Sequence, residues 1–288
     1  MSHVTRINSA ERSAVVRTGQ DQTMQARQRH AVMETGSGPR TLVLAHGYGC
    51  DKNMWQRVVP LLEDGFRIVT YDLMGCGGSD LSAYDRARYD TLDGHASDLI
   101  AILEEMEIEG AILVGHSVSA MTVALVANRR PDLVSELILV CPSPSFINDG
   151  DYVGGFERSD IDTLLETLDA NYLGWSSEMA PAIMGTPHMP EMGETLTNSF
   201  CQADPEIARH FAQVTFLANY RADVAKVSHR SLVLHCRDDV IVPPEVAAWM
   251  QAHMQRIEPV MLDAMGHCPH ISYPAETAAA MRAFLSRG

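Results

Sequence analysis

The sequence predicts an α/β protein with a mostly parallel, doubly wound sheet and an inserted all-helical lid. Short apolar runs alternate with stretches of helical periodicity, which is typical of strands joined by crossover helices. This alternation stops between residues 151 and 224, where the pattern is helical only and too long for a crossover loop. We therefore expect a core formed by residues 25–150 and 225–288, a helical lid at 151–224, and a flexible extension at 1–24.

The composition restricts the classes of partner. The formal net charge of −15 offers no basic surface to a nucleic acid or to an anionic membrane, so neither is expected to bind. No apolar run reaches the roughly 18 residues of a membrane span. The first twenty residues lack the apolar core of a signal peptide. We expect a cytoplasmic protein, in which the six dispersed cysteines are free thiols.

The first part of the core alternates strand and helix. We expect the sheet to begin within residues 25–34 and to continue with strands at 41–45 and 67–71, separated by a helix at about 54–62. The glycine-rich loop at 72–80 lacks the Lys-Ser/Thr pair of a P-loop and the spacing of a dinucleotide fingerprint, so no nucleotide site is expected. Apolar residues at helical spacing then predict a helix over 91–105.

A buried strand at 111–114 must turn sharply into the helix that follows it. Ser117 lies at the apex of this turn, between Gly115 and Ser119, as in a nucleophile elbow. The usual elbow pattern is Gly-x-Ser-x-Gly, and Ser119 departs from it at the last position. Serine is still small enough for close packing of strand and helix. Ser117 is therefore the candidate nucleophile.

The strands predicted at 136–140, 231–235 and 260–262 complete the sheet, and the last two precede the candidate partners of the serine. Asp239, four residues before Pro243, is the preferred acid, and its neighbour Asp238 is expected to cap the loop. His267 is the general-base candidate, with His270 as its competitor. The His267–His270 pair also looks like a metal pair, but no second ligand cluster accompanies it, so neither a metal nor another cofactor is expected.

The order Ser117, Asp239, His267 along the chain is that of the triads of α/β-hydrolases. In this interpretation, His267 takes the proton of Ser117 during attack on a carbonyl, and Asp239 orients the imidazole. A serine at the apex argues against dehalogenases and epoxide hydrolases of this fold, which use aspartate there.

Two backbone N–H groups are candidates for the oxyanion hole. The His-Gly pair at 46–47 directly follows a strand, which makes the N–H of Tyr48 the first donor by position. The second donor is the N–H of Val118, directly after the nucleophile. The predicted lid is rich in aromatic residues, and we expect some of them to roof an apolar pocket over the serine, namely Phe146, Trp175, Phe200 and Phe216.

Several segments together resemble the RsbQ-type α/β-hydrolases, bacterial stress-signalling proteins related to the plant strigolactone and karrikin receptors. They are His-Gly-Tyr-Gly-Cys-Asp (46–51), Gly-His-Ser-Val-Ser-Ala-Met (115–121), Pro-Ser-Pro (142–144) and Gly-His-Cys-Pro-His (266–270), with further likeness at 79–85 and 200–209. The resemblance implies a V-shaped, four-helix lid over a hydrophobic pocket and a triad of Ser117, His267 and Asp239. It also implies a ligand-sensing role coupled to a protein partner, such as a phosphatase with a sensor domain. Tyr48 departs from the Phe usual in these families and adds a hydroxyl to the pocket.

Two hypotheses from different classes follow. The first is an esterase or lactonase that cleaves a small hydrophobic ester for its own sake, through an acyl-enzyme. The second is a barely catalytic or non-enzymatic small-molecule receptor, whose ligand changes the lid and thereby a partner's activity. A lyase or carbon–carbon hydrolase of the same fold would need additional polar groups in the pocket, which the sequence does not place.

Overall fold

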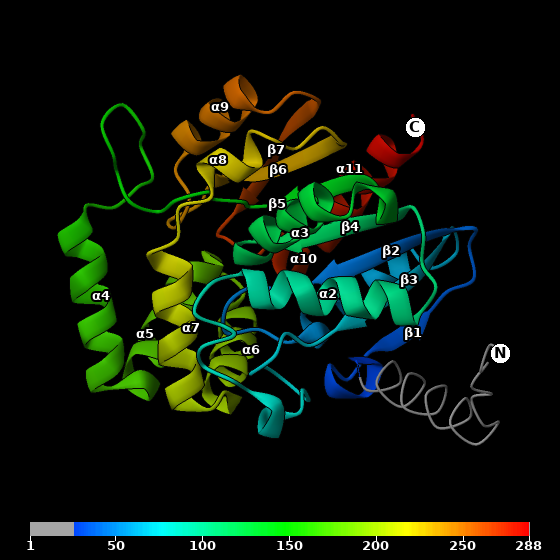
Figure 1. Cartoon of the computed structure of the whole chain (residues 1–288). Helices are drawn as coiled ribbons and strands as arrows, with labels where there is room; N and C mark the ends of the chain where they lie inside the picture. The colour runs from blue at the N-terminus through cyan, green and yellow to red at the C-terminus, as the bar shows by residue number, and fades with distance from the viewer. Residues whose placement is uncertain (1–25, 288) are drawn as a thin grey trace, which may run out of the picture.

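A seven-stranded sheet runs through the middle of the molecule in the order β1-β3-β2-β4-β5-β6-β7 (Figure 1). The computed structural model describes residues 26–287. β1 pairs antiparallel with β3, and every other neighbouring pair of strands is parallel, which confirms the predicted fold class. The strands are β1 (Met33–Thr35), β2 (Arg40–Ala45), β3 (Phe66–Tyr71), β4 (Ala111–His116), β5 (Val134–Val140), β6 (Arg230–Asp238) and β7 (Ile257–Met265).

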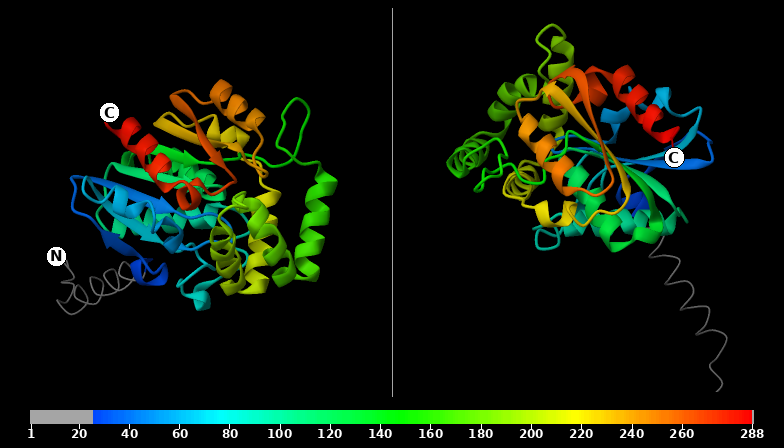
Figure 2. Two further views of the ribbon diagram at one scale, coloured as in Figure 1. Left: turned by 180° about the vertical axis from the view of Figure 1, so that it is seen from behind. Right: turned by 90° about the horizontal axis from the view of Figure 1, so that it is seen from above.

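Both faces of the sheet are covered, so successive side chains of a strand enter two different cores. In β2, Val43 and Ala45 pack on one face, whereas Leu42 and Leu44 pack on the other, and all four are fully buried. The first face carries α2 (Asp93–Glu105), α3 (Val118–Arg129), α8 (Arg221–Val224) and α9 (Pro244–His253). The second face carries α11 (Pro274–Leu285), seen in red in front of the sheet in the left view of Figure 2, with the short α10 (Pro269–Ser272) leading into it.

The prediction of a helix over residues 54–62 was wrong. Two short 3₁₀ turns occupy this region, η1 (Lys52–Trp55) and η2 (Val59–Leu61). Pro60 explains the difference, because proline lacks an N–H for a continuing helix and disfavours helical backbone at the residue before it. Two more 3₁₀ turns lie at η3 (Leu81–Ala83) and η4 (Pro131–Leu133). The last strand is also longer than the 260–262 that its apolar pattern indicated, because β7 pairs with β6 as far as Met265.

Between β5 and the short α8 lie four helices that we call the helical insertion: α4 (Arg158–Ala170), α5 (Tyr172–Met184), α6 (Pro190–Gln202) and α7 (Pro205–Phe216). They pack beside one end of the sheet rather than on either face (Figure 1). The chain leaves and re-enters the core at adjoining points, since Ser145 bridges Asn219 and the N–H of Tyr220 donates to the carbonyl of Pro144 at 2.7 Å. The extension expected at residues 1–24 lies outside the described residues. Among the described residues, no helix is long and apolar enough to cross a membrane.

Candidate active site

Ser117 occupies a sharp turn between β4 and α3. Its backbone has φ 54° and ψ −122°, a conformation that L-residues rarely adopt and that marks a strained turn. The N–H of Ser117 donates to the carbonyl of Val140 on β5 at 2.9 Å, which anchors the turn to the neighbouring strand. A side chain at Gly115 would collide with the backbone of Ser119 and Ala120, so only glycine permits this approach of strand and helix. This hydrogen bond and the close packing at Gly115 together hold the serine in its strained conformation at the end of β4.

Ser117, His267 and Asp239 form one continuous hydrogen-bonded chain. His267 Nδ1 donates to Asp239 Oδ2 at 2.7 Å, because a carboxylate can only accept. The neutral imidazole then carries its lone pair on Nε2, which accepts from Ser117 Oγ at 2.8 Å. The three side chains follow β4, β6 and β7, whose carboxyl ends meet at one edge of the parallel sheet. The arrangement can move a proton from the serine to the histidine while the carboxylate holds the ring.

Asp239 is held as a carboxylate. Burial raises the pKa of Asp239, but the attraction of His267 and the hydrogen bonds from His267, Ile241 and Val242 outweigh this effect and leave the pKa below its ordinary value. Oδ1 accepts from the N–H groups of Ile241 at 2.8 Å and Val242 at 3.1 Å. Asp239 therefore caps its own loop, and the expectation that Asp238 does so was wrong, since Asp238 is exposed at the end of β6.

His116 supports the backbone of His267, a role that the sequence analysis missed. Its Nε2–H donates to the carbonyl of His267 at 2.9 Å. Burial, and then the neighbouring His267, lower the pKa of His116 to about 3, so the ring stays neutral at physiological pH. The signal for this role in the sequence was the position of His116 directly before Ser117. His270, the competing base candidate, instead packs its ring at 4.5 Å from that of Trp55 and is fully buried.

The loop that carries Tyr48 follows β2 and touches the elbow helix. Ser119 Oγ donates to the carbonyl of His46 at 2.5 Å, so the residue that departs from the elbow pattern ties α3 to this loop. Val118 is the first residue of α3, where backbone N–H groups have no partner within the helix. The N–H groups of Tyr48 and Val118 thus belong to two segments that are hydrogen-bonded to each other beside Ser117.

A mostly apolar pocket opens over Ser117. All four aromatic residues expected there line it, from the loop after β5 and from α5, α6 and α7. The full lining is Tyr48, Cys50, His116, Ser117, Phe146, Trp175, Ile183, Leu196, Phe200, Thr215, Phe216, Ile241, His267 and Cys268. The sequence analysis missed Ile183 and Leu196, although Ile183 lies eight residues after Trp175 and Leu196 four before Phe200, which places them on the same helix faces.

One group of potential metal ligands overlaps the hydrogen-bonded chain. Atoms of Cys141, Asp239 and His267 lie within 4.8 Å of one another. Burial, and then the hydrogen bond with Cys236, raise the pKa of the Cys141 thiol well above its ordinary value, so it is a neutral thiol at physiological pH. A metal here would have to replace the proton that His267 donates to Asp239. The arrangement as it stands fits proton transfer between side chains.

The comparisons with known proteins identify the family of this chain. Residues 42–280 match the model of the alpha/beta hydrolase family. The chain belongs to the alpha/beta hydrolase family. It is 38% identical over 250 residues to the karrikin insensitive 2 receptor CA of Petunia hybrida, covering 85% of this chain and 91% of that one. It is 35% identical over 254 residues to the strigolactone esterase RMS3 of Pisum sativum, covering 88% and 95%.

A solved structure extends this family assignment to the three-dimensional fold. A hydrolase from Oleispira antarctica superimposes with a TM-score of 0.90 at 35% identity, covering 92% of this chain and 98% of that one. The agreement includes the helical insertion, because so large a share of both chains aligns. The resemblance to the plant receptor hydrolases is therefore confirmed.

Proposed function

We propose that the protein is a serine hydrolase of the carboxylesterase or lactonase type, which cleaves a small hydrophobic ester or lactone. The observation that carries the proposal is the hydrogen-bonded chain Ser117–His267–Asp239 at the floor of a pocket lined mainly by aromatic and aliphatic side chains. Relatives that are named as esterases support it. Tyr48 and Val118 supply the two oxyanion donors in this proposal.

The reaction follows from the hydrogen bonds. Ser117 Oγ attacks the carbonyl carbon as its proton passes to His267 Nε2, and Asp239 stabilises the imidazolium that forms. The N–H groups of Tyr48 and Val118 stabilise the oxyanion, and loss of one such donor typically costs about 2.7–4 kcal/mol. His267 then protonates the leaving alcohol. Water, activated by the same histidine, hydrolyses the acyl-enzyme and restores the serine.

The helical insertion serves as the lid of this site. Trp175, Phe200 and Phe216 on α5, α6 and α7 form the roof of the pocket. Ser117 is 6% exposed and His267 is 5% exposed, so a ligand in the pocket is largely shielded from water. A dry site strengthens every electrostatic interaction with the developing charge. It also favours hydrophobic ligands over polar ones.

A second function, a ligand-sensing receptor with slow turnover, is favoured by the relatives that are named as receptors. In this case, the ligand or its acyl product would change the position of the lid. The changed surface would then alter the activity of a protein partner, such as a phosphatase with a sensor domain, in the cytoplasm. The two functions share one site and differ in the rate of product release.

A full time course of 4-nitrophenyl acetate hydrolysis at high enzyme concentration distinguishes them. Sustained turnover that is lost in Ser117→Ala supports an esterase. A burst near one equivalent, followed by very slow release, supports the receptor. Absence of serine-dependent release with several acyl esters contradicts the hydrolase proposal itself.

A further inference from the structure

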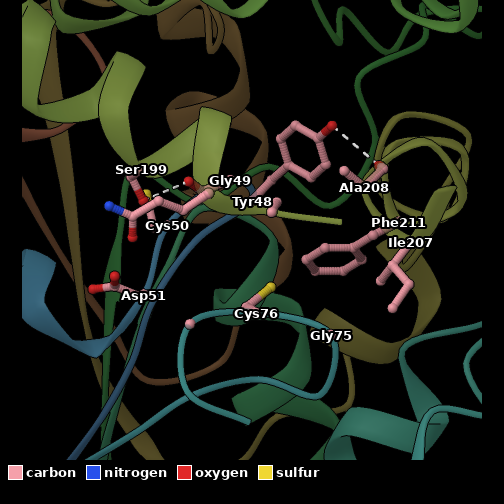
Figure 3. A pocket seen from close by; sticks show the side chains of 13 residues that line it. Tyr48, Gly49, Cys50, Asp51, Gly75, Cys76, Ser199, Ile207, Ala208 and Phe211 are labelled. Carbon is pink, nitrogen blue, oxygen red and sulfur yellow. Dashed lines mark hydrogen bonds between the residues drawn. The ribbon is translucent and has the colours of Figure 1, made fainter. Parts of the chain in front are cut away.

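The Tyr48–Gly49 segment is bound to the helical insertion by its side chain and by its backbone. The hydroxyl of Tyr48 donates to the carbonyl of Ala208 on α7 at 3.1 Å, and Ser199 Oγ on α6 donates to the carbonyl of Gly49 at 2.8 Å (Figure 3). The ring of Phe200 lies so close to Gly49 that no side chain could be accommodated there, and Gly49 also has φ +69°. These contacts meet at a pocket between the segment and helices α6 and α7.

The ring of Tyr48 adds contacts with three helices of the insertion. Its centroid lies 6.4 Å from that of Trp175 on α5, 5.8 Å from Phe200 on α6, and 5.6 and 5.9 Å from Phe211 and Phe216 on α7. These distances are typical of edge-to-face and tilted aromatic pairs. Burial raises the pKa of Tyr48 well above its ordinary value, so its hydroxyl is neutral and can donate to Ala208. A phenylalanine would keep the ring contacts and lose this hydrogen bond.

The other end of the same loop is bound to the core. Ser119 on α3 holds the carbonyl of His46, two residues before Tyr48, whereas Ser199 holds the carbonyl of Gly49, one residue after it. The N–H of Tyr48 lies between these two anchors. The carbonyl of the same peptide, that of Gly47, accepts from the N–H of Cys50 at 3.3 Å, and Cys50 N belongs to the peptide whose carbonyl Ser199 holds.

We propose that Tyr48, through its hydroxyl, and Ser199 are positioning residues that couple helices α6 and α7 to the first oxyanion donor. The inference rests on the proposed function, in which the N–H of Tyr48 stabilises the oxyanion. Movement of α6 or α7 by a ligand turns the Gly49 peptide and, with it, the N–H of Tyr48. The lid position then sets the rate of acylation in addition to the fit of the ligand.

The test compares Tyr48→Phe and Ser199→Ala with wild type. The substrate is 4-nitrophenyl acetate, and the second probe is an aryl trifluoromethyl ketone, whose adduct with Ser117 carries an oxyanion. One net hydrogen bond is worth about 1 kcal/mol, so kcat is expected to fall about fivefold in each variant with KM changed less than twofold. Affinity for the ketone is expected to fall in parallel. If the two losses are additive, the double variant loses about 25-fold, less than the roughly 10²- to 10³-fold loss that follows removal of one oxyanion donor.

Matched controls separate this role from general packing. Tyr152→Phe removes a buried tyrosine hydroxyl that donates to Ser145, and Ser176→Ala removes a buried hydroxyl of α5 that donates within its own helix. Both controls are expected to keep kcat and ketone affinity near wild type. Thermal unfolding checks that each variant is folded, and if one variant does not fold, the other decides.

Three outcomes would overturn the coupling. Folded variants with kcat and ketone affinity within twofold of wild type would contradict it, as would a rise in KM at constant kcat, which indicates ligand contact alone. Equal losses in the controls would indicate packing. These results leave the proposed function intact, provided that Ser117→Ala is inactive. A wild type without serine-dependent hydrolysis would remove the proposed function and this inference together.

Discussion

Replacement of Asp239 by asparagine tests the central hydrogen-bonded chain with almost no change of shape. Oδ1 of Asp239 faces two backbone donors, the N–H groups of Ile241 and Val242, so the single oxygen of asparagine is expected to occupy that position. The amide NH₂ then faces His267 Nδ1, which must become an acceptor. The proton of the neutral ring moves to Nε2, and the histidine can no longer accept from Ser117.

The size of the effect follows from the loss of the correct tautomer. An aspartate-to-asparagine change in a serine triad lowers kcat by about 10⁴-fold, equivalent to about 5.4 kcal/mol of activation free energy. We expect a loss of this size for Asp239→Asn in the acylation rate with 4-nitrophenyl acetate. Because both backbone donors keep their acceptor, thermal stability should change by much less than the activity does.

The neighbouring aspartate supplies the control. Asp238→Asn alters an exposed carboxylate one residue away and should leave the acylation rate within twofold of wild type. If Asp239→Asn kept more than a tenth of wild-type activity while Ser117→Ala kept none, the tautomer argument would be wrong. If Asp238→Asn were the more damaging change, the acid would have been misassigned.

Three further predictions concern the surroundings of the site. Ser119→Ala removes the hydrogen bond to His46, and kcat should fall about fivefold; an unchanged kcat would mean that packing alone holds the loop. Trp175→Ala should lower the free energy of unfolding by about 3–5 kcal/mol in urea titrations and raise kcat/KM for octanoate relative to acetate esters, whereas an unchanged ratio would place Trp175 outside the acyl site. Burial lowers the pKa of His235 to about 4, so between about pH 6.5 and 4 the unfolded chain binds a proton that the folded chain does not, and stability decreases as the pH is lowered. His235→Gln should therefore lose about 1.4 kcal/mol less than wild type between pH 7.5 and 5.5, and equal losses would refute this.

The positions of Ser117, Asp239 and His267 in the sequence were sufficient to predict that the three side chains lie close together. Ser117 and Asp239 follow buried apolar runs, and His267 follows the shorter apolar run at 260–262; in a parallel sheet the carboxyl ends of such runs meet at one edge. The sheet and the helical insertion were predictable for a similar reason, because a change of hydrophobic period is visible in the chain. The prediction of a helix at 54–62 was wrong because it followed the apolar pattern and did not account for Pro60.

Contacts between distant segments could not be predicted in this way. Ser119 looked like a defect in the elbow pattern, and only the folded chain shows its hydroxyl on the carbonyl of His46. The hydrogen bond from Tyr48 to Ala208 joins residues 160 positions apart. No local periodicity encodes such a pair, because it depends on how α7 docks against the loop after β2.

The short bridge at the base of the helical insertion has a consequence for how such proteins diversify. Ser145 and Asn219 form a bridge, and Tyr220 is hydrogen-bonded to Pro144. The helical insertion therefore begins and ends at one stem, formed by these four residues. Another segment could replace the insertion at that stem, or a short turn could connect its two strands, without changing the strand order. Exchange of one contiguous segment would alter which molecules are admitted, while the three side chains of the hydrogen-bonded chain, which lie outside that segment, are inherited unchanged.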